Sequence, residues 1–154
     1  NRMANLGKIP EFKKSVWKAI GDEVADRIRL LTTKGGKDVF NKPFKVYSKG
    51  YAKRKPKIAR GGTNFGSKVN LQLSGDMMRN LQTRGFTNES VVIGWSGVEA
   101  QKVGWNSEMG RFVTTRAKPV SDGVLRFVLK EIDRQIEKNI KKQTSKPINY
   151  KIGK

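Results

Sequence analysis

The 154-residue chain contains no cysteine and no histidine, and it has only 13 acidic residues against 33 basic ones. Without cysteine, neither a disulfide framework nor a thiolate zinc site can form. Cysteine nucleophiles and serine–histidine–aspartate catalysis are excluded as well, because the nucleophile or the base is missing. A metal would have to rely on the few carboxylates. We therefore expect no enzyme activity, no cofactor and no metal site, and a function in binding or assembly.

Long apolar runs are missing too. A membrane-spanning helix needs about 20 consecutive apolar residues, whereas the runs here are as short as Leu30–Leu31 and Val91–Ile93. We therefore expect no membrane partner, and a protein made in the cytoplasm.

The positive charge is concentrated in one part of the chain. Residues 32–70 carry eleven bases and one acid, which is half of the net charge of +20. Such an excess favours a polyanionic partner: nucleic acid first, then an acidic protein surface, and third an anionic membrane. Aromatic residues are interleaved with the lysines, and a purely disordered linker carries fewer of them. We predict an extended basic arm that becomes ordered on DNA or on a neighbouring subunit, with a solvated loop as the alternative. The candidate contact residues are Lys45, Lys49, Lys53, Arg54, Lys55, Lys57, Arg60 and Lys68.

Two segments have the apolar spacing of long amphipathic helices. The first predicts a helix over about residues 10–31 and the second a helix over about residues 121–142. We expect both stripes to face the core, and a subunit interface is the alternative. The stripes are Ile9, Phe12, Val16, Ile20, Val24, Ile28 and Leu31, and then Val124, Val128, Ile132, Ile136 and Ile140, flanked by Leu125 and Leu129.

The region between these helices predicts a small sheet. β-branched runs indicate strands over residues 90–95 and 110–115, with a weaker candidate over 44–47. A short helix is expected over 75–82, with Ser74 as its cap. The fold class is therefore α+β, a small antiparallel sheet packed against two long helices with a long extended basic loop. We expect a single domain over residues 1–142, which contains the arm at 32–70, and a basic C-terminal tail over 143–154.

Aromatic and methionine side chains are the candidate packing or interface residues. Trp95 and Trp105 have ring faces on which bases can stack, but in a small α+β domain such residues are more often core or interface anchors. The chain has no helix-turn-helix, zinc-finger or RNA-binding-sheet pattern, so we expect no sequence-specific reading of DNA. The full set is Tyr47, Tyr51, Phe65, Met77, Met78, Leu81, Trp95 and Trp105.

From Tyr51 to about residue 142, the order of motifs resembles a family of long-tailed phage proteins. These are the tail-completion or head–tail joining proteins of the phage neck, also called virion morphogenesis proteins. The motifs are Tyr51-Ala52-Lys53-Arg54-Lys55, the segment from Asn70 to Leu81 around Ser74-Gly75, Val91-Val92-Ile93-Gly94, Ala100 with the segment Asn106 to Arg111, and Arg116-Ala117-Lys118-Pro119-Val120.

The resemblance implies a structural protein of the virion without enzyme activity. It would be made in the host cytoplasm and would form a homo-oligomeric ring, with six-fold symmetry favoured, in the neck or tail. The implied partners are further copies of the chain, the neighbouring head-connector and tail proteins, and the DNA in the channel. The alternative is a small basic protein that binds nucleic acid without sequence specificity.

Overall fold

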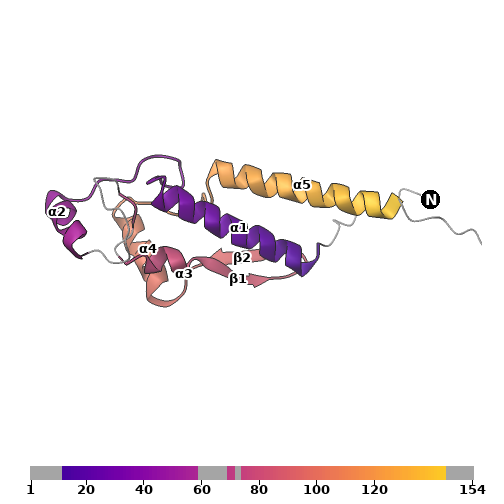
Figure 1. Ribbon diagram of the computed structural model, residues 1–154, viewed down its shortest axis with the longest axis horizontal. Coiled ribbons are helices and arrows are strands. Elements are labelled where there is room, and N and C mark those ends of the chain that lie inside the picture. The colour runs from indigo at the N-terminus through magenta and orange to yellow at the C-terminus, as the bar shows by residue number, and fades with distance from the viewer. Residues whose placement is uncertain (1–11, 59–68, 72–73, 145–154) are drawn as a thin grey trace, which may run out of the picture.

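The computed structural model describes residues 12–58, 69–71 and 74–144. Figure 1 labels the elements in chain order. Their bounds are α1 Lys14–Thr33, α2 Lys49–Ile58, α3 Asp76–Asn80, β1 Gln82–Phe86, β2 Val91–Gly94, α4 Gly97–Glu108 and α5 Asp122–Thr144. The combination of helices with a small antiparallel sheet confirms the predicted α+β class.

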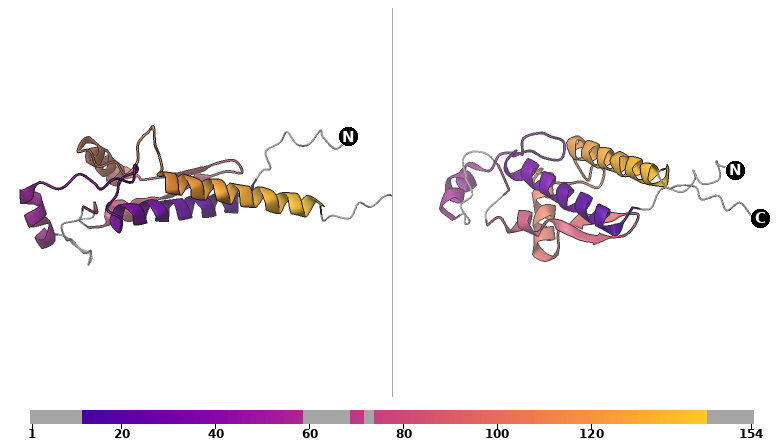
Figure 2. Two further views of the ribbon diagram at one scale, coloured as in Figure 1. Left: turned by 90° about the horizontal axis from the view of Figure 1, so that it is seen from above. Right: turned by 45° about the vertical axis from the view of Figure 1, so that its right-hand side comes forward.

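Helix α1 is the central element of the molecule. It packs against both strands and against α5, which runs antiparallel to it (Figures 1 and 2). Ile20, Val24 and Ile28 lie on its inner face and are buried, as the helical spacing predicts. The core continues from this row to Met78 in the middle of α3 and to Leu81, which directly follows α3. Both predicted long helices are therefore present.

Helix α1 begins at Lys14, a few residues later than predicted. Lys13 is extended, with ψ of 142°, and Phe12 is buried against Trp17 with 5.6 Å between the ring centroids. An apolar residue that precedes the cap and packs on the first turn is a hydrophobic staple, which fixes how the chain enters the helix. Phe12 continues the apolar periodicity of the helix, so the pattern alone does not separate a staple from a helical residue.

The sheet is a two-stranded antiparallel hairpin. Its second strand confirms the prediction at 90–95, whereas its first strand is not indicated by the sequence pattern. Thr83 pairs with Ile93 but Gly85 pairs with Val92, so Arg84 is an extra residue in β1. A bulge of this kind bends the strand and increases its twist.

Close contact between α1 and the hairpin depends on a glycine. A Cβ atom on Gly21 would lie 2.5 Å from Val91 Cγ2 and 2.6 Å from Thr83 Oγ1. At the tip of the hairpin, the Trp17 indole N–H donates to the carbonyl of Asn88 at 2.8 Å. The absence of a Cβ atom on Gly21 lets the hairpin approach α1 closely, and the Trp17 hydrogen bond fixes the hairpin tip to the same helix.

The two other predicted strands are wrong. Residues 44–47 and 110–115 are irregular segments outside any sheet. Phe44 is buried in the core, and the Val39 N–H donates to the Phe112 carbonyl at 2.8 Å. The β-branched and aromatic residues of these segments pack two loops together, which is why they have the composition of strands.

The basic arm predicted over residues 32–70 is not one extended loop. Its first part is a tight turn in which Asp38 Oδ1 accepts hydrogen bonds from the backbone N–H groups of Phe40 and Lys42. Its second part is α2, a helix that the sequence pattern does not indicate. Residues 59–68 lie outside the described part of the chain. The described part of the arm therefore folds within this chain.

Two shorter helices flank the hairpin. Helix α3 is shorter than the predicted 75–82 at both ends: Gly75, with φ of 83°, takes the cap position expected for Ser74, and Leu81 is already extended, with ψ of 114°. Helix α4 is not indicated by the sequence, and only Val103 of its residues is fully buried. The two helices contact each other, and this contact places residues 74–77 opposite residues 102–109.

Helix α5 contains the predicted second stripe, but that stripe is only partly covered. Val124 is buried, whereas the side chains of Leu125, Leu129 and Ile140 are 48%, 53% and 54% exposed. The last turns of α5 extend past the start of α1 (Figures 1 and 2). The expected core-facing stripe therefore has an apolar edge that is open to solvent.

Candidate functional site

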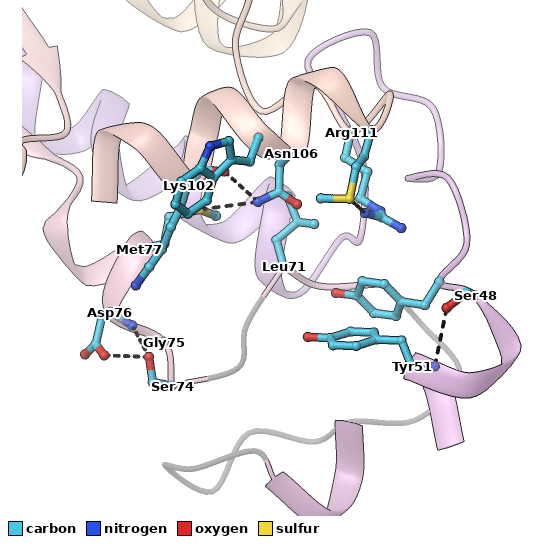
Figure 3. Close-up of a pocket in the computed structure, with 13 residues that line it drawn as sticks. Ser48, Tyr51, Leu71, Ser74, Gly75, Asp76, Met77, Lys102, Asn106 and Arg111 are labelled. Atoms are coloured by element: carbon cyan, nitrogen blue, oxygen red, sulfur yellow. Dashed lines mark hydrogen bonds between the residues drawn. The ribbon is translucent and has the colours of Figure 1, made fainter. Parts of the chain in front are cut away.

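A cavity of about 520 Å³ lies where α2, the start of α3 and α4 meet (Figure 3). Its volume falls within the range of about 300–1,000 Å³ that is usual for ligand pockets. The walls come from described residues within 47–51, 74–77 and 102–111, together with Leu71. Because these segments are far apart in sequence, the cavity is a product of tertiary packing.

One wall of the cavity is aromatic. The rings of Tyr47 and Tyr51 meet edge to face, with 4.9 Å between their centroids and 64° between their planes. The Tyr51 N–H donates to Ser48 Oγ at the start of α2, and the Tyr51 ring projects into the cavity (Figure 3). Burial, and then the neighbouring Tyr51, raises the pKa of Tyr47 above its ordinary value of 10.0. The Tyr47 hydroxyl is therefore uncharged at neutral pH.

The opposite wall combines apolar and polar groups from α3 and α4. Trp105 is 52% exposed, and Met77 lies beside it on the cavity lining. The Asn106 amide donates to the Lys102 carbonyl at 2.8 Å, and the Lys102 ammonium pairs with Glu99 at 2.7 Å. An aromatic face thus stands next to fixed polar groups.

Lys55 of α2 points into the protein and is 2% exposed. Its ammonium donates to Asn70 Oδ1 at 2.7 Å and to the Tyr47 hydroxyl at 3.2 Å, and it lies 4.6 Å from the centroid of the Tyr47 ring. Burial, and then the positive charge of Arg111, lowers the pKa of Lys55 from 10.5 to about 8. Lys55 therefore attaches α2 to the body, and its predicted role as a surface contact for phosphate is wrong.

Arg111 holds the segment that leads into α2. Its guanidinium donates to the carbonyls of Lys45 and Val46 at 3.0 and 3.2 Å and lies 4.8 Å from the Tyr47 ring centroid. The side chain is 7% exposed. The buried cations of Lys55 and Arg111 thus both lie over the Tyr47 ring. Each cation is attracted electrostatically to the negatively polarised face of this ring.

The outer surface of α2 is basic. Lys49, Lys53, Arg54 and Lys57 are all exposed, and α2 contains no acidic residue. Tyr51 and Lys55, one turn apart, form its inner face. The helix therefore has a cationic side toward solvent and an aromatic side toward the cavity.

No protein-family model, curated protein or solved structure matches the chain.

In residues 12–58, 69–71 and 74–144, no three acidic side chains cluster in a way that could hold a metal ion. No helix in the same ranges is both long and apolar enough to cross a membrane. What the cavity and the basic helix can do is bind an apolar group and an anionic group side by side.

The structure brings together only some of the residues singled out in the sequence. Tyr47, Tyr51, Met77 and Trp105 line the cavity, while Lys45, Lys49, Lys53, Arg54 and Lys57 are exposed. Met78 and Leu81 are core residues, and Trp95 packs on the core with its indole N–H donating to the Met77 carbonyl at 2.8 Å. Arg60, Phe65 and Lys68 lie outside the described residues.

Sequence reasoning missed Arg111, Asn70, Lys102 and Met109 as members of this site. Arg111 and Asn70 fall within motifs that resemble the phage family, but nothing in those motifs indicates that they contact the arm. Lys102 belongs to α4, a helix that has no clear apolar periodicity, and Met109 directly follows this helix. These residues can be assigned to the site only once it is known which segments of the chain meet in space.

Proposed function

We propose that the chain is a structural protein of a phage virion. It forms a ring in the neck or tail that completes the tail or joins the head connector to the tail around the DNA channel. The motif order between Tyr51 and Val120 supports this assignment. The structural observation that carries it is the uncovered apolar edge of α5.

The apolar edge of α5 has the form of a helix interface. Leu125, Leu129, Ile132, Ile136 and Ile140 follow one another at steps of three or four residues, which places them along one stripe. Three of the five are about half exposed. Monomeric soluble proteins rarely leave large contiguous apolar patches uncovered, and such patches mark sites of association. A contact in which this edge meets a different surface of the next copy is heterologous, and heterologous contacts form a ring when the rotation between successive copies closes.

The small sheet also favours assembly. A two-stranded hairpin has marginal stability alone, and in the described residues it has no third strand. Val92 of β2 is 60% exposed. An open strand edge next to exposed apolar side chains is suited to pairing with a neighbouring chain.

The decisive test is disruption of the gene in the phage that carries it, followed by electron microscopy. We expect full heads and separate tails. Complementation with Leu125→Gln/Leu129→Gln should not restore joined particles, whereas the matched control Arg126→Gln/Lys130→Gln, on the same two turns of α5, should restore them. Normal joined particles after disruption would contradict the proposal.

The second candidate function is binding of nucleic acid without sequence specificity. The exposed bases on α2 favour it, because they can contact successive phosphates. Fluorescence anisotropy with a duplex of arbitrary sequence tests this candidate. Tight binding at about 200 mM salt, without any ring partner, would favour it over the ring.

A further inference from the structure

We propose that the cavity between α2 and α4 binds a large apolar or aromatic side chain from an acidic segment of a neighbouring protein. This inference deepens the proposed function, because it states the chemistry of the partner that the chain meets in the particle.

The apolar part of the inference comes from the cavity lining. Trp105, Tyr51 and Met77 present two aromatic faces and a flexible thioether around a space that is large enough for one or two side chains. Aromatic anchors in such pockets supply much of the binding energy at protein interfaces. Methionine adapts to the shape of the side chain that enters.

The acidic part of the inference comes from the charges around the cavity. Lys102 and Arg111 line it, and Lys53 and Arg54 stand exposed on the outer side of α2. Asp76 is the one acidic residue in the described lining, and it already pairs with Arg79. Because Lys102 already pairs with Glu99, the charge that would attract carboxylates beside the anchor comes from Arg111 and from the exposed bases of α2, which contains no acidic residue. A basic segment would be repelled.

A protein segment accounts for the whole site better than DNA does. Phosphate groups need only the exposed bases of α2, and these would bind DNA without any cavity. The cavity adds an apolar, sulfur-containing wall that a phosphate backbone does not use. A side chain from a peptide uses the cavity and the bases together.

The test begins with a displayed library of random twelve-residue peptides, selected on the immobilised full chain. We expect the selected peptides to share one large apolar residue flanked by aspartate or glutamate. Calorimetry with the best peptide, made synthetically, should then show that Trp105→Ala weakens binding about thirtyfold. The control Leu30→Ala removes a similarly exposed apolar residue near the end of α1, outside the cavity lining, and should leave binding unchanged.

A second pair of variants tests the charges. Lys53→Gln/Arg54→Gln should weaken peptide binding several-fold and reduce its salt dependence, whereas Arg126→Gln/Lys130→Gln should not. Failure to enrich any peptide, enrichment of peptides without acidic flanks, or equal binding by Trp105→Ala would overturn the inference. So would tighter, Trp105-dependent binding of a twelve-nucleotide oligothymidine, which would assign the cavity to nucleic acid. None of these outcomes bears on whether heads and tails are joined in virions that lack the chain. The gene disruption therefore tests the proposed function independently of the peptide-binding experiment.

Discussion

At the scale of single residues, Gly21 sets the distance between α1 and the hairpin. A methyl group there would overlap Val91 and Thr83, and overpacking of this kind typically costs about 1–3 kcal/mol. Alanine would gain up to about 1 kcal/mol from its higher helix propensity. The steric cost is larger, so Gly21→Ala should lower the free energy of unfolding.

The control for this prediction is Gly104 in α4. A Cβ atom on Gly104 would meet nothing within 4 Å, so Gly104→Ala should keep or slightly raise stability through helix propensity alone. Urea unfolding followed by circular dichroism measures both variants. Equal effects of the two substitutions would show that Gly21 is not a contact point.

Lys55 makes stability depend on pH. Its pKa is about 8 in the folded chain against an ordinary value of 10.5. Between these pH values the unfolded chain binds a proton that the folded chain does not, so stability rises with pH. Below about pH 8 both states are protonated, and the cost of burying the charge is fully present. We expect the wild-type chain to gain about 1–2 kcal/mol between pH 7.5 and 9.5 from this group.

Replacement of the buried ammonium isolates this effect. Lys55→Met should abolish the rise in stability with pH, whereas Lys53→Met, at an exposed position on the same helix, should retain it. Urea midpoints at a series of pH values provide the measurement. A parallel rise in wild type and Lys55→Met would show that folding does not lower the pKa of Lys55.

At the scale of elements, the attachment of α2 depends on Arg111. Its two hydrogen bonds to the carbonyls of Lys45 and Val46 hold the chain just before the helix. Hydrogen bonds from a charged donor contribute about 1.5–3 kcal/mol. Arg111→Lys cannot make the same forked contact, so local opening of residues 45–57 should become more frequent.

Trypsin detects such opening, because the segment contains many lysines. Cleavage at Lys49, Lys53 or Arg54 should be faster in Arg111→Lys than in wild type. The matched control is Arg116→Lys, which changes an exposed arginine in a nearby loop and should leave the cleavage rate unchanged. Identical rates in all three proteins would mean that Arg111 does not limit the opening of the arm.

The elements that could be predicted are those in which the spacing of apolar residues matches the residues that are buried. The apolar spacing of α1 and α5 is regular over several turns, so both helices were predictable within a few residues. Helix α2 has almost no apolar residue and contains Pro56, and its burial rests on Tyr51 and the unexpected Lys55. Strand β1, with Arg84 and Gly85 in its centre, has no alternation to detect. In these cases tertiary contacts override the local pattern.

At the scale of the whole molecule, the net charge of +20 opposes compaction. The seven ion pairs in the described residues join partners three or four residues apart on or beside helices, and most are exposed. Each such pair contributes only about 0.3–0.5 kcal/mol. Repulsion among the excess bases acts over longer distances and should dominate.

Salt therefore should stabilise the isolated chain. Raising the ionic strength from about 10 to about 150 mM shortens the screening length from about 30 to about 8 Å, and we expect the thermal midpoint to rise by a few degrees. Scanning calorimetry in sodium chloride measures this change, with an equal osmolality of sucrose as the control. A fall in the midpoint would mean that the short-range ion pairs outweigh the repulsion.

The site was less predictable than the fold. The sequence singled out Tyr47, Tyr51, Met77 and Trp105 as interface residues, but nothing in their spacing showed that they surround one space. The basic run at residues 53–57 was assumed to face outward as a whole. The helical turn instead points Lys55 inward while Lys53, Arg54 and Lys57 stay outside, a division that appears only once α2 is known to be a helix.

The three tryptophans give the molecule a built-in optical reporter. Trp17 donates its indole N–H to the hairpin tip, Trp95 donates to the Met77 carbonyl in the first turn of α3, and Trp105 is half exposed at the cavity. Each indole thus senses a different event: docking of the hairpin, docking of α3, or occupancy of the cavity. Replacing two of them by phenylalanine at a time would yield three fluorescent proteins that report these events separately, without any attached dye.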